Sequence, residues 1–579
     1  MINQPLMRRC ALPALLMLAA ACGREPATET PSQSAPRAAS ATPVTIYAGG
    51  PIYTGVDGEI AQAVAVSEGE IIAVGDLSLI EGAAGPRSVV IDFEGAAMYP
   101  GFVDAHAHLI GIGQRELVLN LEGTPSLAAL VQQVAETVEN TEDGQVVYGR
   151  GWIETGWPEG RMPNRDDLDA VSPDNPVILT RADGHALVAN SSALDAAGVN
   201  DETPDPAGGR IERDDNGRAT GILIDNAEGL VLTLIDAPDE AAKTEAYKQA
   251  STVYTAYGWT GLHNMSVNPQ NLDLIERLSD EGALALRVYN SLNPSGLDML
   301  AEQGAQTNAN GRVVTRAVKL YMDGALGSRG ALLTSPYADQ PETSGLLLME
   351  KPEAMAYFAK ALTAGIQINT HAIGDEANRL LLDWYEEAFT ANPEAATDAR
   401  WRDEHTQILH TEDIPRYAEL GVIASMQPSH AIGDLFFAPD RLGPDRLDGA
   451  YAWRSLIDAG AVVAGGSDAP VERGDPLIEF YAAVARRGLD GTQTQEWRPD
   501  QSVTRAEALK MFTIWPAYAS FAEDRLGTIE PGKSADFTVF SQDIMTIPEA
   551  DILKTKALMT IIEGDIVYDG RNSVGQNKQ

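Results

Sequence analysis

Two histidines, His106 and His108, stand two residues apart at the end of a short apolar stretch that begins at Pro100. Successive side chains of a β-strand point to opposite faces, so residues i and i+2 point the same way. The spacing therefore predicts that both imidazoles leave one side of a strand end and can bind one metal ion. A metal at the carboxyl end of a barrel strand is placed for hydrolytic chemistry. Such a pair also arises on ordinary polar surfaces, so the prediction depends on the rest of the chain.

Further side chains suited to metal binding or acid–base chemistry lie in or near later strand-like stretches: Lys319, His371, His405 and Asp468. Imidazole and carboxylate ligands suit zinc and related divalent metals. Catalytic zinc keeps a position open for water and lowers its pKa to about 7, and an aspartate beside that water can pass its proton to a leaving amine. A lysine fits such a site once carbamylated by carbon dioxide, because the product is an anionic carboxylate that can bridge two metals.

The elements that must position these side chains alternate between strand-like and helix-like patterns over residues 99–527. Repeated βα units in this number predict the α/β class and a (β/α)8 TIM-like barrel, which gathers the ends of its strands on one face. Residues 113–188 are too many for one crossover, so we expect an insertion over the barrel mouth. Short β-rich runs in residues 44–98 and 528–579 predict a small, discontinuous β-sandwich domain.

Length and charge agree with a large enzyme that does not bind nucleic acid. The 579 residues exceed one core of ordinary size, which predicts a large catalytic domain and a smaller one. The net charge of −41, from 42 Lys+Arg and 83 Asp+Glu, leaves nothing to neutralise phosphates. We interpret it as a solvated acidic surface. Both cysteines, Cys10 and Cys22, precede the predicted folded region, which excludes a disulfide and thiolate metal ligation there.

The first 22 residues are typical of an export signal. Arg8 and Arg9 precede an apolar run too short to span a bilayer, and the run ends at Cys22. This end resembles a bacterial lipobox with its leucine one place early, which predicts a lipoprotein anchored at Cys22 on the periplasmic side of a bacterial membrane. A plain secretory peptide cleaved after Ala-x-Ala is the alternative. Residues 23–43 are rich in Ala, Pro, Ser and Thr and predict a flexible tether.

Seven ordered motifs make the chain resemble the amidohydrolase superfamily and, within it, the YtcJ-like group, amidohydrolase family 3. The motifs are residues 99–108, 318–329, 370–375, 403–407, 425–428, 466–470 and 526–536. The resemblance implies that His106 and His108 hold a first metal, that His371 and His405 hold a second, and that a carboxylated Lys319 bridges them. It also implies that Asp468 binds the first metal and acts as general base. One metal or two stays open, because the superfamily contains both kinds.

The same resemblance implies hydrolysis of a carbon–nitrogen bond other than a peptide bond in a small-molecule amide, such as an N-acyl or N-formyl amine. The divalent metal is expected to be zinc. One alternative keeps the site but opens a cyclic amide or a carbamate, or cleaves an ester. Another is a solute-binding lipoprotein without turnover, against which Asp468 argues, because a pure binder needs no general base. The oligomeric state is open, a homodimer included.

Candidates for contacting the substrate are His185, Asp323, Arg329 and His430. For several of these a structural role is an open alternative. Asp323 and Arg329 could pair with each other, and His430 could serve packing alone. We expect His263 to be a core histidine and Asp104 to be a structural partner of the metal site.

Overall fold

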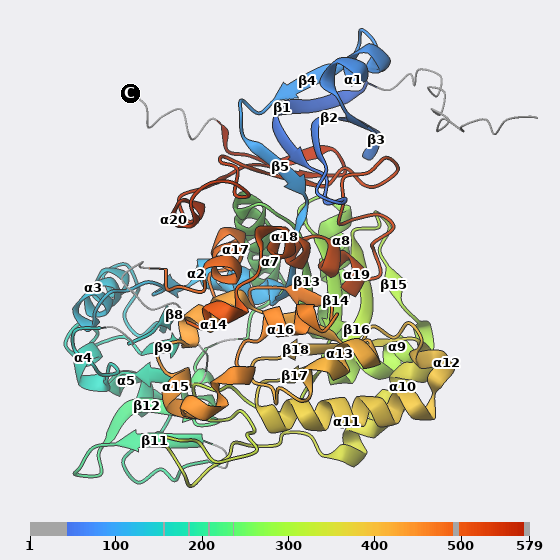
Figure 1. Ribbon diagram of the computed structural model, residues 1–579. Helices are drawn as coiled ribbons and strands as arrows, with labels where there is room; N and C mark the ends of the chain where they lie inside the picture. The colour runs from blue at the N-terminus through green and yellow to red at the C-terminus, as the bar shows by residue number, and fades with distance from the viewer. Residues whose placement is uncertain are drawn as a thin grey trace, which may run out of the picture. The chain divides into compact units, whose positions relative to one another are not determined.

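The computed structural model describes residues 43–154, 157–182, 184, 186–206, 209–235, 237–489 and 497–571. All of them belong to the unit Thr42–Gln579. The predicted export signal, the tether with Cys22, and the predicted substrate contact His185 lie outside the described residues. The described strands form three sheets, which Figure 1 colours by position along the chain.

The central sheet is the predicted barrel. Its parallel strands are β6 (Phe102–Ala107), β13 (Trp259–Val267), β14 (Arg287–Leu292), β16 (Val313–Tyr321), β17 (Gln367–Ala372), β18 (Arg402–His405), β19 (Ile423–Met426) and β20 (Val463–Gly465), with β15 (Gln306–Thr307) antiparallel on β16. The last strand meets the first, because the Asp468 amide donates to the His106 carbonyl at 2.7 Å and the His108 amide to the Ala469 carbonyl at 2.8 Å. These two bonds bring the predicted ligands from opposite ends of the sheet together.

Helices cover the outside of the barrel. They include α2 (Leu109–Leu117), α7 (Glu240–Tyr257), α8 (Leu272–Asp280), α9 (Leu297–Gln303), α10 (Lys351–Ala364), α11 (Asp375–Ala391), α13 (Ile414–Leu420), α14 (Pro428–Asp434), α16 (Trp453–Asp458), α17 (Pro476–Ala485), α18 (Arg505–Phe512) and α19 (Ile514–Ala519). Local chemistry sets their ends: the Asp239 carboxylate caps α7, and Gly258 ends it at a φ of 107°. Buried aromatic side chains such as Trp259 and Trp401 belong to one apolar cluster of strand and helix residues. The strands and the helices around them therefore share one packed apolar core.

The two ends of the chain share one sheet. Its strands are β1 (Thr45–Tyr53), β2 (Ile60–Ser67), β3 (Glu70–Gly75), β4 (Val89–Asp92), β5 (Ala97–Pro100), β21 (Phe537–Phe540), β22 (Ala557–Ile562) and β23 (Asp565–Asp569), with α1 (Leu77–Ala84) and α20 (Glu549–Ile552) beside them. The antiparallel pairing of β21 with β5 joins the C-terminal segment to the N-terminal one. The sequence predicted a discontinuous β-sandwich from these two segments, and the structure joins their strands in one hydrogen-bonded sheet of eight strands.

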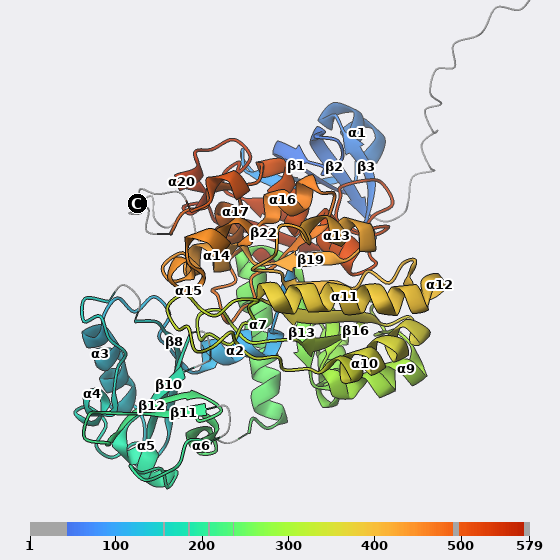
Figure 2. The ribbon, with the colours of Figure 1, turned by 60° about the horizontal axis from the view of Figure 1, so that its bottom comes forward.

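The inserted region forms the third sheet, in the order β11-β12-β10-β9-β8-β7. Its elements are β7 (Leu119–Asn120), α3 (Leu127–Val138), β8 (Val147–Trp152), α4 (Arg165–Asp169), β9 (Val177–Arg181), β10 (Ala186–Ala189), α5 (Ser191–Ala196), β11 (Gly209–Arg213) and β12 (Ala219–Asp225). The sheet therefore runs on to residue 225, beyond residue 188, where the sequence placed the end of the insertion. Figures 1 and 2 both show it on the opposite side of the barrel from α10 and α11.

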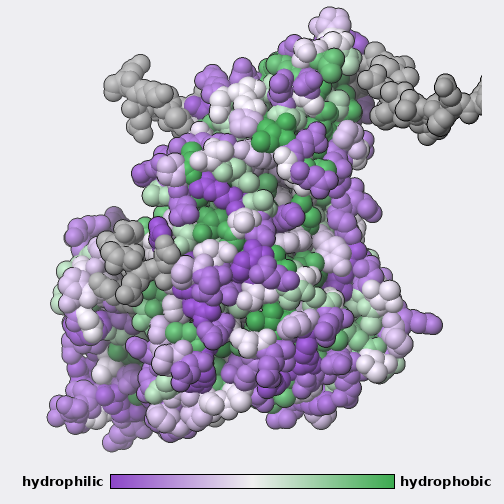
Figure 3. Space-filling view, in the orientation of Figure 1, coloured by the Kyte–Doolittle hydropathy of each residue, from purple (hydrophilic) through white to green (hydrophobic). Residues whose placement is uncertain are grey.

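The remaining short helices are α6 (Gly229–Leu232), α12 (Pro393–Ala396) and α15 (Ala438–Leu442). Among the described residues, no helix has the length and apolar character needed to cross a membrane. Hydrophilic residues cover most of the face seen in Figure 3.

Candidate metal centre

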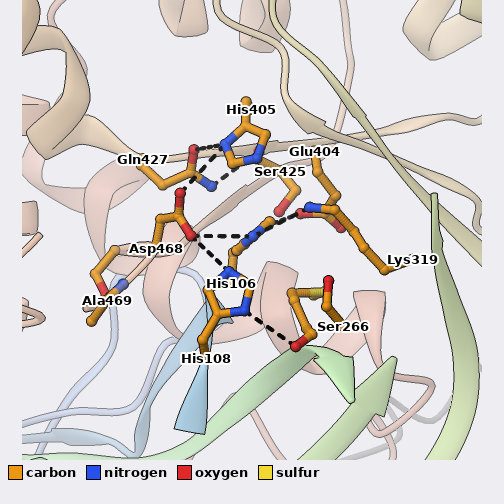
Figure 4. Close-up of polar contacts among 12 residues, drawn as sticks. His106, His108, Ser266, Lys319, Glu404, His405, Ser425, Gln427, Asp468 and Ala469 are labelled. Carbon is orange, nitrogen blue, oxygen red and sulfur yellow. Dashed lines mark hydrogen bonds and ion pairs between the residues drawn. The ribbon is translucent and has the colours of Figure 1, made fainter. Parts of the chain in front are cut away.

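The predicted ligands occupy neighbouring positions at the barrel mouth. His106 lies in β6, Lys319 in β16, His371 in β17 and His405 at the end of β18, and Asp468 follows β20. Figure 4 shows His106, His108, Lys319, His405 and Asp468 gathered around one point. Closure of the barrel brings them together, as expected for a site at the carboxyl ends of the strands.

The proton of the His106 imidazole is fixed by Glu404. His106 Nδ1 lies 2.6 Å from Glu404 Oε2, and Arg402 Nε lies 2.7 Å from Glu404 Oε1. Burial alone would raise the pKa of Glu404, but Arg402 and His106 hold it well below its usual range. A carboxylate only accepts hydrogen bonds, so Nδ1 donates and the lone pair is on Nε2. Burial, with Lys319 nearby, lowers the pKa of His106 to about 4, and the ring is neutral.

His108 is oriented by a backbone carbonyl. Its Nδ1 lies 3.2 Å from the carbonyl oxygen of Met265, which can only accept, so the lone pair of His108 is also on Nε2. That nitrogen lies 3.1 Å from Asp468 Oδ1, and His106 Nε2 lies 3.4 Å from the same oxygen. Two imidazole lone pairs and a carboxylate oxygen thus face one another, an arrangement that a bound cation stabilises.

His405 completes this cluster through an unusual backbone conformation. Ligand atoms of His106, His405 and Asp468 all lie within 4.8 Å of one another, and all three residues are buried. Alternation along β18 directs Arg402 and Glu404 inward and would turn His405 away from them. His405 instead has a φ of 82°, and Asp468 has one of 57°, in the left-handed region that non-glycine residues seldom adopt. The strained backbone at both ligands is what brings their side chains to the centre.

Gln427 supports His405, and the sequence analysis did not select it. Its Oε1 lies 2.9 Å from His405 Nδ1 (Figure 4). The only signal for it in the sequence is its place in the motif 425–428. An amide oxygen accepts, so Gln427 orients the His405 ring as Glu404 orients that of His106.

Lys319 and His371 flank the cluster. Lys319 Nζ lies 3.4 Å from His106 Nε2, and burial lowers the pKa of Lys319 to about 8. The His371 ring packs against that of His405 with centroids 4.5 Å apart, and burial lowers the pKa of His371 to about 3. His371 Nε2 faces Asp323 Oδ1 at 3.5 Å. Both residues adjoin the cluster, but neither belongs to the group of His106, His405 and Asp468, and a second metal stays a prediction.

Asp104 holds β6 against the segment before Asp468, which confirms its predicted structural role. Its Oδ1 accepts from the amides of His106 at 3.1 Å and Ser467 at 2.9 Å. Its Oδ2 accepts from Tyr254 at 3.0 Å and from the Ser467 hydroxyl at 2.6 Å. These bonds set the spacing between the first and last strands of the barrel.

Like Glu404, Arg402 is a residue that the sequence analysis did not select. Its side chain is fully buried. Its Nη1 lies 2.7 Å from His263 Nδ1, and its Nη2 donates to the Ser425 hydroxyl at 2.7 Å. Because an arginine only donates, His263 accepts, and its predicted role as a core histidine is confirmed. The signal was present in the sequence, since Arg402 and Glu404 stand two apart on one strand face.

The predicted substrate contacts have different surroundings. His430, in α14, lies with Nε2 3.8 Å from Asp468 Oδ2. Asp323 is buried and accepts the backbone amides of Leu332, Ile373 and Gly374. Arg329 pairs with Asp339 at 2.7 Å, so the alternative that Asp323 and Arg329 pair with each other is wrong. A substrate contact by any of the three stays a prediction.

A parallel barrel with a cluster of imidazoles and a carboxylate at its mouth defines the class of metal-dependent barrel hydrolases. Residues 89–568 match Amidohydro_3, the amidohydrolase family, and the chain belongs to this family. It is 33% identical over 531 residues to "Putative amidohydrolase YtcJ" of Bacillus subtilis strain 168, covering 90% of this chain and 99% of that protein. The predicted membership of the YtcJ-like group is thereby confirmed.

Two further relatives agree with this assignment. The chain is 31% identical over 540 residues to the "N-substituted formamide deformylase" of Arthrobacter pascens, covering 89% of this chain and 96% of that one. The crystal structure of an uncharacterized metal-dependent hydrolase from Pyrococcus horikoshii OT3 matches with a TM-score of 0.71 and 29% identity, covering 87% of this chain and 99% of that chain. The resemblance therefore extends over nearly the whole length of each relative.

Proposed function

We propose that this amidohydrolase cleaves the carbon–nitrogen bond of a small, non-peptide N-acyl amine, with N-substituted formamides as the first class to test. The observation that carries the proposal is the convergence of His106 Nε2 and His108 Nε2 on Asp468 Oδ1, at 3.4 and 3.1 Å. The similarity to a formamide deformylase directs the choice of acyl group.

The donor set fits one or two zinc ions. His106, His108 and Asp468 would hold the first, and His371 and His405 the second, with Lys319 between them. A bound divalent metal supplies polarisation of the substrate carbonyl and a lowered pKa for water. Asp468 is the proposed general base. Its Oδ1 faces His106 and His108, which leaves Oδ2, 3.9 Å from His405 and 3.8 Å from His430, to take a proton. It takes the proton of the attacking water and returns it to the nitrogen as the C–N bond breaks.

Lys319 is the proposed site of carboxylation. Its side chain is buried, and the lowered pKa of about 8 makes the neutral amine accessible near neutral pH. The amine nitrogen forms a bond to the carbon of carbon dioxide and loses a proton, which leaves an anionic carbamate. That product removes a buried cation from beside His106 and adds anionic oxygen ligands to the site.

The first experiment is elemental analysis of a soluble form that starts at Ala27, purified without chelator or added metal. We expect about one to two zinc equivalents per chain, with loss of metal in the double variant His106→Ala, His108→Ala. His410→Ala is the matched control, because His410 Nε2 contacts the Thr334 hydroxyl at 2.7 Å, outside the cluster. Absence of metal in the wild type, with no gain on adding zinc and bicarbonate, would refute the metal site.

The second experiment is turnover on matched panels of N-substituted formamides, N-acyl amines, cyclic amides, carbamates and esters. Cleavage of formamides or N-acyl amines is expected, and Asp468→Asn should abolish it while ligand binding persists. If the enzyme instead prefers cyclic amides, carbamates or esters, the proposed substrate class changes to the preferred one. Binding without turnover in the metal-loaded wild type would favour the solute-binding alternative.

A further inference from the structure

His430 has a defined proton arrangement. Its Nδ1 lies 2.9 Å from Gln407 Nε2. An amide nitrogen only donates hydrogen bonds, so Nδ1 is the acceptor and the ring proton is on Nε2. Both residues are buried. The backbone of Gln407 is fixed as well, since its carbonyl accepts the Tyr451 amide at 2.6 Å.

The Nε2–H of His430 is an unused donor at the metal centre. The atom is buried and has no hydrogen-bond partner among the described residues. Asp468 Oδ2 lies 3.8 Å away, beyond the reach of a hydrogen bond. Buried donors are nearly always paired in folded proteins, so this donor is available to a molecule that binds beside Asp468.

The position of this donor relative to Asp468 indicates which molecule. Asp468 Oδ1 faces His106 and His108, whereas Oδ2 faces His405 and His430. The Nε2–H group therefore stands on the side of Asp468 that is turned away from His106 and His108. An acyl oxygen bound on this side of Asp468 would lie within reach of the His430 N–H donor.

We propose that His430 donates its Nε2–H to the acyl oxygen of the substrate, where negative charge develops, and that Gln407 is the positioning residue that fixes this tautomer. The proposal rests on the proposed function, since it requires an acyl substrate. Donors placed in advance at a developing oxyanion are worth about 10²–10³-fold in kcat each.

The support behind His430 is rigid, as a preorganised donor requires. The first turn of α14 is anchored where the Ser429 amide donates to Glu479 Oε2 at 2.9 Å. The His430 ring also stacks on that of His405, with centroids 6.0 Å apart and an interplanar angle of 18°. His430 is thus held in position by its surroundings before a substrate binds.

The test compares His430→Gln with His430→Met. A glutamine amide can place an N–H close to the position of Nε2, whereas methionine fills the space without a donor. We expect kcat to fall about 10²–10³-fold in His430→Met and clearly less in His430→Gln, with unchanged zinc content and little change in KM. Equal losses in both variants would overturn the proposal.

A sulfur-substituted substrate separates hydrogen bonding from packing. Sulfur is a weak acceptor, so the difference between the wild type and His430→Met should shrink when a thioformamide replaces the formamide. A packing role for His430 predicts the same loss with both substrates, and that result would also overturn the proposal.

The tautomer is measured without any turnover, by ¹⁵N NMR of histidine-labelled, zinc-loaded protein. The His430 signals, assigned by their loss in His430→Gln, should report protonated Nε2 and unprotonated Nδ1. Gln407→Leu should alter that pattern, and it should lower kcat in the wild type but not in the His430→Met background. The opposite tautomer in the wild type would refute this inference, whereas failure to cleave any acyl substrate would refute the proposed function.

Discussion

Replacing Glu404 with glutamine removes one charge from beneath the metal centre while it preserves the shape of the side chain. Glu404 accepts from His106 Nδ1 at 2.6 Å and pairs with Arg402, and neither Glu404 nor Arg402 is exposed to solvent. The amide can offer His106 an N–H instead of an acceptor. The proton of His106 is then no longer held on Nδ1. When it lies on Nε2, that nitrogen has no lone pair with which to bind the metal.

Two magnitudes follow from these contacts. Outer partners of metal-bound histidines are worth about 10–100-fold in metal affinity, and we expect a zinc Kd that is higher by this factor. The other described partners of Arg402, which are His263, Ser425 and the Ala105 carbonyl, are neutral. The variant therefore leaves a buried cation without an anion, and the free energy of unfolding should fall by about 3 kcal/mol.

The neighbouring residue supplies the control. Asp403 is also buried in β18, but its carboxylate accepts from Tyr417, away from His106. Asp403→Asn should affect stability and leave zinc affinity unchanged. Chelator competition measures the Kd, and denaturant unfolding of the metal-free protein measures stability. If Glu404→Gln binds zinc as tightly as Asp403→Asn does, the role assigned to Glu404 is refuted.

Three further predictions address other parts of the molecule. The Lys319 pKa is lowered to about 8 by burial, so the unfolded state holds more protons between pH 8 and about 10.5. Without metal and bicarbonate, the wild type should gain stability over this window relative to Lys319→Met, by about 1.4 kcal/mol per pH unit, and parallel denaturation curves would contradict this. Tyr254→Phe removes the bond to Asp104, and should cost about 1–3 kcal/mol in denaturant unfolding; an unchanged midpoint would count against the Asp104 network. Cys22→Ser should move the full-length protein from the membrane to the soluble fraction, and an unchanged distribution would disprove the lipid anchor.

The fold was predictable because its signals are local. Strand-like stretches separated by helix-like ones occur along the chain whatever the tertiary structure, and a right-handed βα repeat leaves few ways to arrange them. The i, i+2 spacing of His106 and His108 is a local signal of the same kind. The end of the insertion was not predictable, because the strands up to β12 (Ala219–Asp225) belong to it by pairing with β10, which no local pattern encodes.

The sequence by itself indicated which residues could bind a metal and which strands would present them. Tertiary structure alone decided how these side chains are arranged and which partners they have. Glu404 and Arg402 become partners of His106 only because β18 lies inside a closed barrel. The left-handed backbone at His405 reverses the alternation that a strand would impose. Tautomers follow the same rule, since the proton on each imidazole depends on a partner far away in sequence but near in the folded barrel.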